Sequence, residues 1–307
     1  MGRLEEMQAF LCTAEAQSFT GAAQRLGQSK SMISQRVADL EARLGVRLLN
    51  RTTRRLSLTE AGQAFLEGCS RALHEVEDAE EAASRHGSEL RGTLRIAAPL
   101  SFALLHLKPA LLGFMTAHPE LEVNLDMDDR VVDLVQGGYD MALRIGRLPD
   151  SSLIARRLAP SRIVVCASPA YLVERGRPEH PEQLAQHECL IYTGSARSDQ
   201  WSFQIDGRWT AVPVHGRLQT NNGDMLMAAA IAGWGVAMLP SFIVGAALEN
   251  GDLTCLLQGY PTLDGAIHAV YPASRQVSRR VRVFCDFLAE RIGNNPYWDK
   301  LLPPLPG

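Results

Sequence analysis

The sequence predicts a fold that is α/β overall, with an N-terminal all-α module, a long linker helix and a C-terminal two-lobed α/β domain. Three observations predict it: apolar residues at helical spacing in the first 58 residues, a proline-free helical run from 59 to 86, and alternating strand and helix patterns after residue 91. A chain of 307 residues is long enough for roughly two or three such units.

The composition is that of a folded globular protein, with 46% hydrophobic and 21% charged residues. The N-terminal segment has neither a basic leader nor a continuous apolar core, and we expect no signal peptide and no membrane-spanning run. The cysteines form no CxxC pair, which argues against a zinc ribbon or a disulfide framework. We therefore expect a cytoplasmic protein without a metal or other cofactor. The six cysteines are Cys12, Cys69, Cys166, Cys189, Cys255 and Cys285.

Charge is distributed unevenly along the chain. Residues 1–58 contain nine Lys or Arg and five Asp or Glu, whereas residues 59–90 contain two and eight. Residues 91–307 are nearly balanced, at 20 basic and 21 acidic. A basic module, an acidic segment and a neutral domain are thus predicted in that order.

Two helices around a short polar break are predicted within residues 18–45. The second helix has apolar residues spaced four, three and four apart, which predicts one buried face made of Ile33, Val37, Leu40 and Leu44. The first is short, opened by Ser18 or Thr20 and closed by Gly27. Residues 4–16 predict a third amphipathic helix. Together the three helices describe a helix-turn-helix unit.

The segment "VRLLNRTTRRLSLTEAG" that follows predicts a small β-ribbon, or wing, with an arginine-rich tip at residues 50–55. Such a tip would meet phosphates, while the second helix of the pair would turn its polar face to base edges in the major groove. A solvated helical hairpin is the alternative interpretation of the helix pair alone. The predicted DNA-binding residues are Thr20, Lys30, Ser31, Ser34, Gln35, Arg36, Arg51, Thr53, Arg54 and Arg55.

From Thr59, a predicted N-cap, the linker helix has small and apolar residues spaced alternately four and three apart. That heptad seam predicts a coiled-coil dimer contact, although a helix packed on its own domain fits the spacing equally well. Residues 85–92 are expected to be the hinge. The seam residues are Phe65, Cys69, Ala72, Val76, Ala79 and Ala83.

The large domain is predicted to have two lobes joined by two crossovers. Its tail, a strand and a helix after residue 265, is expected to return to the first lobe. The predicted boundaries are 1–58 for the winged module, 59–90 for the linker helix and hinge, and 91–307 for the large domain, with lobe I at 91–162 and 265–307 and lobe II at 163–264.

Ligands of α/β sheets bind beyond the carboxyl ends of strands, where helix N-termini offer free N–H groups. "PLSF" and "TNNGD" occupy such places, and Arg144 ends another strand. Helix capping without a ligand is the alternative for Ser101 and Asn222, and a structural ion pair is the alternative for Arg144. Trp201, Trp234 and Tyr192 are expected in the core or at its rim. The predicted effector-binding residues are Pro99, Leu100, Ser101, Phe102, Arg144, Ile145, Gly146, Asn221 and Asn222.

The stretch "FTGAAQRLGQSKSMISQRVADLEARLGVRLLNRTTRRLSLTEAG" resembles the winged helix-turn-helix of LysR-type transcriptional regulators. Lys30 and Met32 stand where many members have Pro, Ala or another small residue. The resemblance implies a homodimer, paired into a tetramer, that grips an interrupted palindrome in double-stranded promoter DNA. RNA polymerase is a further partner that it allows.

Residues 91–292 resemble the effector-binding domain of the same family, which is similar to type-2 periplasmic-binding proteins. "RIGRLPDSSLIARRLAP", "CASPAYL" and "NNGDML" carry this resemblance, and "PLSF" is most similar to the contact-regulated-gene-regulator subgroup. It implies a small effector, with an anionic one suited to Arg144, that changes DNA binding.

Two other classes of function would use a chain of this kind. A two-lobed small-molecule-binding protein or an enzyme would have the same fold, but no nucleophile, base and orienting group stand at a recognisable spacing, and we expect no enzyme. A redox sensor would need reactive cysteines close together, and the sequence places no cysteines of the large domain near each other.

Overall fold

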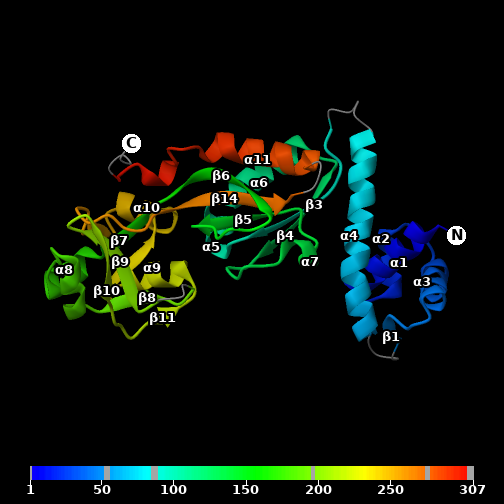
Figure 1. Ribbon diagram of the computed structural model, residues 1–307, viewed down its shortest axis with the longest axis horizontal. Coiled ribbons are helices and arrows are strands. Elements are labelled where there is room, and N and C mark those ends of the chain that lie inside the picture. The colour runs from blue at the N-terminus through cyan, green and yellow to red at the C-terminus, as the bar shows by residue number, and fades with distance from the viewer. Residues whose placement is uncertain (1, 52–55, 84–88, 195–197, 274–276, 303–307) are drawn as a thin grey trace. The chain divides into compact units, whose positions relative to one another are not determined.

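The computed structural model describes residues 2–51, 56–83, 89–194, 198–273 and 277–302. The chain forms two compact units, Met1–Gly92 with Asp133–Tyr139, and Thr93–Val132 with Asp140–Gly307. The first unit holds the N-terminal helices, the wing, the linker helix and the short helix α7 (Leu134–Gly137). The second holds two five-stranded sheets (Figure 1).

The first unit begins with three helices, α1 (Arg3–Ala16), α2 (Phe19–Arg25) and α3 (Lys30–Leu44). Serine hydroxyls cap the second and third. Ser18 Oγ accepts a hydrogen bond from the N–H of Gly21, and Ser29 Oγ accepts one from the N–H of Met32. Each such cap stabilises a helix by about 1 kcal/mol. The structure thus selects Ser18, and not Thr20, as the N-cap of the short helix.

The predicted buried face of α3 is confirmed for three of its four residues, which are fully buried: Ile33, Val37 and Leu40. The prediction is wrong for Leu44, which is 36% exposed. The helix ends beside it at Gly45, whose φ of 70° reverses the chain. Leu48 and Leu49, each 1% exposed, then enter the core in its place.

The wing consists of β1 (Leu49–Arg51) and β2 (Leu56–Leu58), which pair antiparallel and confirm the predicted ribbon. Its tip, residues 52–55, lies outside the described residues. Glu41 of α3 fixes the start of the wing, because its carboxylate accepts hydrogen bonds from the N–H groups of Leu48 and Leu49 at 2.8 and 3.0 Å. A Cβ at Gly62 would lie 2.0 Å from the Leu48 carbonyl oxygen, so only glycine permits this close approach.

The linker helix α4 (Glu60–Ala83) starts at the predicted cap, since Thr59 Oγ1 accepts a hydrogen bond from the N–H of Gly62 at 2.9 Å. Its first half packs on its own domain. Cys69 is 1% exposed, its thiol donates to the Met7 carbonyl, and the Phe65 ring stands edge-on to Phe10 at 5.5 Å.

The predicted dimer seam is therefore wrong at Cys69, because this side chain is already buried within one chain. Phe65 is also committed to that core, and so is Leu73, which the seam omitted. Ala72 and Ala79 are exposed and Val76 is half-buried. The side chain of Ala83 and residues 84–88 of the predicted hinge lie outside what the structure describes.

Lobe I is built on a sheet of order β4-β3-β5-β14-β6, in which β3 and β5 are parallel and β14 is antiparallel to both its neighbours. Its strands are β3 (Gly92–Ala98), β4 (Leu121–Met127), β5 (Met141–Gly146), β6 (Leu153–Ser161) and β14 (Gly265–Pro272). Its helices are α5 (Leu100–Phe102), a π-helical turn (Ala103–Leu107), α6 (Lys108–Ala117) and α11 (Arg279–Ile292). As predicted, β14 and α11 return to this lobe (Figure 1).

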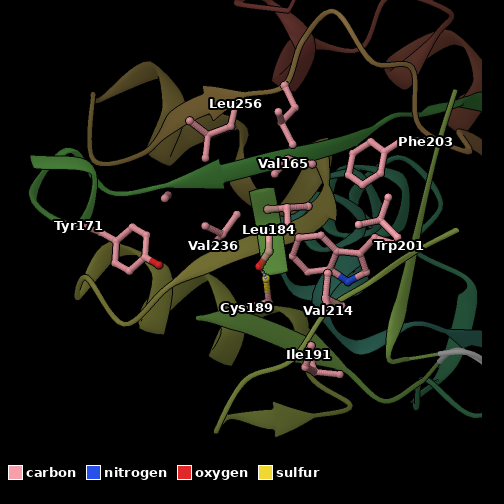
Figure 2. Close-up of a cluster of buried hydrophobic side chains, with 13 residues drawn as sticks. Val165, Tyr171, Leu184, Cys189, Ile191, Trp201, Phe203, Val214, Val236 and Leu256 are labelled. Atoms are coloured by element: carbon pink, nitrogen blue, oxygen red, sulfur yellow. Dashed lines mark hydrogen bonds between the residues drawn. The ribbon is translucent and has the colours of Figure 1, made fainter. Parts of the chain in front are cut away.

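Lobe II is built on a sheet of order β11-β8-β12-β7-β13, with a separate hairpin of β9 and β10. Its strands are β7 (Ile163–Ala167), β8 (Cys189–Tyr192), β9 (Gln200–Ile205), β10 (Arg208–Pro213), β11 (Gln219–Thr220), β12 (Val236–Pro240) and β13 (Thr254–Leu256). Its helices are α8 (Pro169–Arg175), a 3-10 helix (Pro181–Gln186), α9 (Gly223–Ile231) and α10 (Ser241–Glu249). Trp201 and Phe203 of β9 fill its core with Val165, Leu184 and Val236 (Figure 2).

The chain crosses between the lobes a third time near its C-terminal end, which the sequence did not predict. A 3-10 turn, Tyr297–Asp299, packs on α10. A Cβ at Gly245 would lie 2.4 Å from the Trp298 carbonyl oxygen, so the glycine allows the contact. His106 of lobe I joins the same cluster, with Nδ1 2.6 Å from the Tyr297 hydroxyl and Nε2 2.8 Å from the Phe242 carbonyl oxygen.

One helical stretch, Leu100–Ala117, is long and apolar enough to cross a membrane, contrary to the prediction that no run reaches that length. It is 44% buried within the structure. Phe102, Leu107 and Phe114 are fully or almost fully buried, and Lys108 and Pro109 interrupt the stretch. We therefore assign it to the core of lobe I.

Candidate DNA interface and effector site

The outer face of α3 carries the side chains predicted to contact DNA bases. Lys30, Ser31 and Gln35 are exposed, Ser34 is half-buried, and Thr20 of α2 is exposed. Ser31 Oγ lies 3.0 Å from Oγ of the cap Ser29, and the Gln35 amide nitrogen donates to Asp39 at 2.7 Å. A DNA base that accepts a hydrogen bond from the Gln35 side-chain amide must therefore compete with the Asp39 carboxylate for that donor.

Arg36 does not fit its predicted place in the DNA interface. Its side chain is only 14% exposed, and it donates to Glu5 of α1 at 3.0 Å and to Gln28 at 2.9 Å. The guanidinium therefore holds α3 against α1 and the turn before it. Arg51 has its backbone in β1, while Thr53, Arg54 and Arg55 lie outside the described residues.

Arg47 is an exposed basic residue beside the wing that the sequence pattern did not single out. Its carbonyl accepts a hydrogen bond from Thr59 Oγ1 at 2.7 Å, which ties the backbone before β1 to the start of α4. The excess of basic residues in this module is the signal that would have included it.

Two of the predicted effector-binding segments meet at the junction of the lobes. The Ser101 hydroxyl, 5% exposed, donates to the Asp224 carboxylate of α9 at 2.5 Å. The N–H of Leu100 donates to the Asp129 carboxylate at 3.1 Å. The two donors predicted to receive a ligand are thus occupied by acidic side chains, Asp129 and Asp224, which were not among the predicted site residues.

Carboxylates gather at this junction, where Asp129 lies near Asp224 and the neighbouring Asp128 is ion-paired with Arg130 at 2.6 Å. Burial raises the pKa of Asp129, and the neighbouring carboxylates of Asp128 and Asp224 add to the rise, although the Leu100 N–H opposes it. Burial and the charge of Asp129 likewise raise the pKa of Tyr192. Like charges that disfavour one another also disfavour an added anion.

The other predicted effector residues have structural roles in this arrangement. Asn222 caps α9, because its side-chain oxygen accepts from the N–H of Met225 at 2.9 Å. Arg144 Nη2 donates to the Val132 carbonyl at 2.9 Å. Phe102 is fully buried among aromatic rings, so its prediction as a ligand contact is wrong.

Pro99, Leu100, Ile145 and Gly146 are half-buried, and Asn221 is exposed. Gly146 has a φ of 116°, and a Cβ at Gly265 would lie 2.6 Å from its Cα. The two glycines thus let β5 and β14 approach closely at the end of β5 and the start of β14, near the lobe junction.

A cavity of about 590 Å³ lies elsewhere, within lobe II, and is lined by none of the predicted effector residues. Both acidic and basic side chains line it, including an ion pair of 3.7 Å between Arg217 and Glu188. Trp234 at its edge is 59% exposed, which agrees with a rim position, whereas Trp201 belongs to the core. Among the described residues, no cluster of His, Cys, Asp or Glu has the arrangement of a metal site.

The expectation that no cysteines of the large domain lie close together is wrong. Cys166 of β7 and Cys255 of β13 are directly opposite each other in the lobe II sheet. The sequence did not reveal this pair because the two cysteines belong to strands that are far apart along the chain.

Family models match nearly the whole chain. Residues 4–63 match the bacterial regulatory helix-turn-helix protein of the lysR family, and residues 87–293 match the LysR substrate binding domain.

Similar proteins are regulators of the same architecture. An uncharacterized HTH-type transcriptional regulator of Haemophilus influenzae is 36% identical over 281 residues, covering 92% of this chain and 98% of its own. The HTH-type transcriptional regulator CrgA of Neisseria meningitidis serogroup C is 36% identical over 293 residues, covering 95% and 97%.

Solved structures agree. The structure of CrgA from Neisseria meningitidis has a TM-score of 0.62 at 34% identity, and that of the Vibrio cholerae virulence activator AphB has 0.61 at 29%; each covers 94% of this chain and 99% of the other. With a helix pair and wing in its first unit and two α/β lobes in its second, this chain belongs to the LysR family of transcriptional regulators.

Proposed function

We propose that this protein binds an interrupted palindrome in promoter DNA and that a small effector, bound between its lobes, changes that binding. The observation that carries the DNA part is the exposed polar face of α3, with Lys30, Ser31 and Gln35, over a fully buried opposite face. Because the buried face of α3 is packed against the rest of its module, the exposed face can place these side chains at base edges in the major groove.

The wing supports the same proposal. Glu41 and Gly62 fix where β1 begins relative to α3 and α4. Arginines at residues 51, 54 and 55 would then contact phosphates on either side of the groove, adding affinity that does not depend on sequence.

Dimerisation is proposed through the outer part of α4, at Ala72, Val76 and Ala79, with Ala83 continuing the seam. Small side chains at these positions let two helices approach closely. In this proposal the domains are residues 1–58, 59–90 and 91–307. Two dimers pair into a tetramer on DNA. The tetramer contacts RNA polymerase at the promoter, in the cytoplasm. The protein acts by binding, not by catalysis.

The effector response is proposed to work through the bond between Ser101 and Asp224. This bond joins the start of α5 in lobe I to the first turn of α9 in lobe II. A ligand that accepts the hydrogen bond of the Ser101 hydroxyl must therefore displace Asp224, and this frees α9 to move relative to lobe I. Because Asp129 and Asp224 are both acidic, we propose a neutral or cationic group beside Ser101 in place of the anionic one that Arg144 suggested. A ligand shifts the lobes only by its difference in affinity for the two arrangements.

The experiment is an electrophoretic mobility shift with the full-length protein on the DNA upstream of its own gene, in excess unrelated DNA and over a salt series. Lys30→Ala should weaken specific binding and lower the slope of log affinity against log salt by about 0.9 for each phosphate that the variant no longer neutralises. Lys108→Ala, which removes an exposed lysine from α6 in the other unit, is the matched control and should bind as the unchanged protein does.

Specific retardation that Lys30→Ala weakens and Lys108→Ala leaves intact supports the interface. Equal affinity of the Lys30→Ala variant and the unchanged protein at every salt concentration would remove Lys30 from it. Failure to retard any specific DNA, with the oligomer intact, would overturn the proposed operator.

A further inference from the structure

Two cysteines of lobe II face each other across neighbouring strands. The register of β13 on β7 is antiparallel and pairs Thr254 with Ala167, Cys255 with Cys166, and Leu256 with Val165. β13 is the edge strand of its sheet. Residues directly opposite in antiparallel strands have Cα atoms about 4.5 to 5.5 Å apart, within the range of about 4.4 to 6.8 Å that a disulfide requires.

Both thiols lie on the same face of the sheet. Val165, Ala167 and Leu256 point into the core cluster shown in Figure 2. Side chains alternate along a strand, so Cys166 and Cys255 point to the opposite face together. Burial raises the pKa of the Cys166 thiol, and the charge of a Cys255 thiolate would raise it further.

The two thiols differ in their surroundings. Cys166 is fully buried, and Cys255 is half-buried on the edge strand. Arg177 Nη2 donates to the carbonyl of Cys255 at 2.8 Å. Burial raises the pKa of the Cys255 thiol, and a hydrogen bond from Gln258 and the charges of Arg162 and Arg177 oppose this rise. Cys255 is thus the more accessible and more easily ionised of the pair.

We propose that Cys255 and Cys166 form a thiol–disulfide switch that hydroperoxides oxidise. The Cys255 sulfur attacks the outer oxygen of the hydroperoxide, the O–O bond breaks, and the products are Cys255 sulfenic acid and one molecule of alcohol or water. The Cys166 sulfur then attacks the sulfenic sulfur, forming the S–S bond and releasing water with the thiol proton. Two thiols lose two electrons to the hydroperoxide, and a dithiol reverses the change.

The position of the pair connects it to the lobe junction. β7 begins directly after the crossover from β6, and β13 ends just before the crossover to β14. The disulfide would therefore tie together the lobe II ends of both crossovers and hold the edge strand in its register. This inference is independent of the proposed effector site, since it requires no ligand at Ser101.

The test is mass spectrometry of the full-length protein after graded exposure to hydrogen peroxide, with free thiols blocked and the protein digested without reductant. A peptide joining Cys166 to Cys255 should form first, with the loss of two hydrogen atoms, and should disappear after dithiothreitol. Cys12, Cys69, Cys189 and Cys285, free in the structure, serve as internal controls and should remain alkylated as single thiols.

Two variants test the order of events. In Cys166→Ala, Cys255 should accumulate as sulfenic acid that dimedone traps, whereas in Cys255→Ser, Cys166 should stay reduced. Alanine is chosen at the buried position to preserve folding, and circular dichroism checks it. The proposal is overturned if the joined peptide is absent at peroxide levels that oxidise the control cysteines, or if Cys166 is oxidised equally well without Cys255.

Discussion

Ser101→Ala tests how far one hydrogen bond between the lobes holds α9 against lobe I. The Ser101 hydroxyl is 5% exposed and donates to Asp224 at 2.5 Å, across 123 positions of sequence. A hydrogen bond to a charged group contributes about 1.5 to 3 kcal/mol net, and the lower end applies here because Asp224 is only half-buried. A loss of about 1.5 kcal/mol changes the equilibrium between the closed and the open contact of α9 with lobe I roughly ten-fold.

The assay is amide hydrogen exchange of the full-length protein, followed by mass spectrometry of peptides covering residues 99–103 and 222–226. Both should exchange up to about ten-fold faster in Ser101→Ala, because exchange follows the free energy of local opening. Ser168→Ala is the matched control. This serine is 3% exposed and also lies at the start of a helix, where it accepts from the N–H of Tyr171 at 3.3 Å, but it lies wholly within lobe II.

The control should leave residues 99–103 unchanged. Unaltered exchange at 222–226 in Ser101→Ala would refute the idea that this bond holds α9 to lobe I. Equal acceleration in both variants would show that the effect comes from a general loss of stability.

Two further predictions concern stability. Burial lowers the pKa of His106 below its ordinary value of 6.5, so the unfolded chain binds the imidazole proton more tightly than the folded chain does. The free energy of unfolding should therefore fall as the pH falls through 6.5. In urea denaturation at about pH 7.5 and about pH 5.5, the His106→Leu variant should show a smaller difference between the two pH values than the unchanged protein. Gly245→Ala should cost about 1 to 3 kcal/mol by displacing the Trp298 backbone. Gly113→Ala, with no atom within 4 Å of its new Cβ, should be neutral or stabilising in the same denaturation, and an equal loss in both variants would refute the packing argument.

The local elements of the N-terminal module follow from its amino-acid sequence alone. Ile33, Val37 and Leu40 repeat at the helical period and are buried, and Ser18 and Thr59 cap the helices that follow them. Each of these features depends on residues within a turn or two of one another. The order of strands and helices in the two lobes was predictable for the same reason. The prediction that Leu44 is buried was wrong because the environment of Leu44 depends on the path of the chain after Gly45.

Which side chains share a site, in contrast, depends on how distant parts of the chain pack together. Arg36 has the position of a DNA contact in the sequence, but Glu5, 31 positions away, holds it in the fold. Ser101 has the position of a ligand donor, yet the fold places the Asp224 carboxylate on it. The pairing of Cys166 with Cys255 follows from the register of two strands that the sequence separates widely. Periodicity reports which face of an element is buried, but the partner on that face is fixed by long-range packing, so such contacts become visible only when the chain is folded.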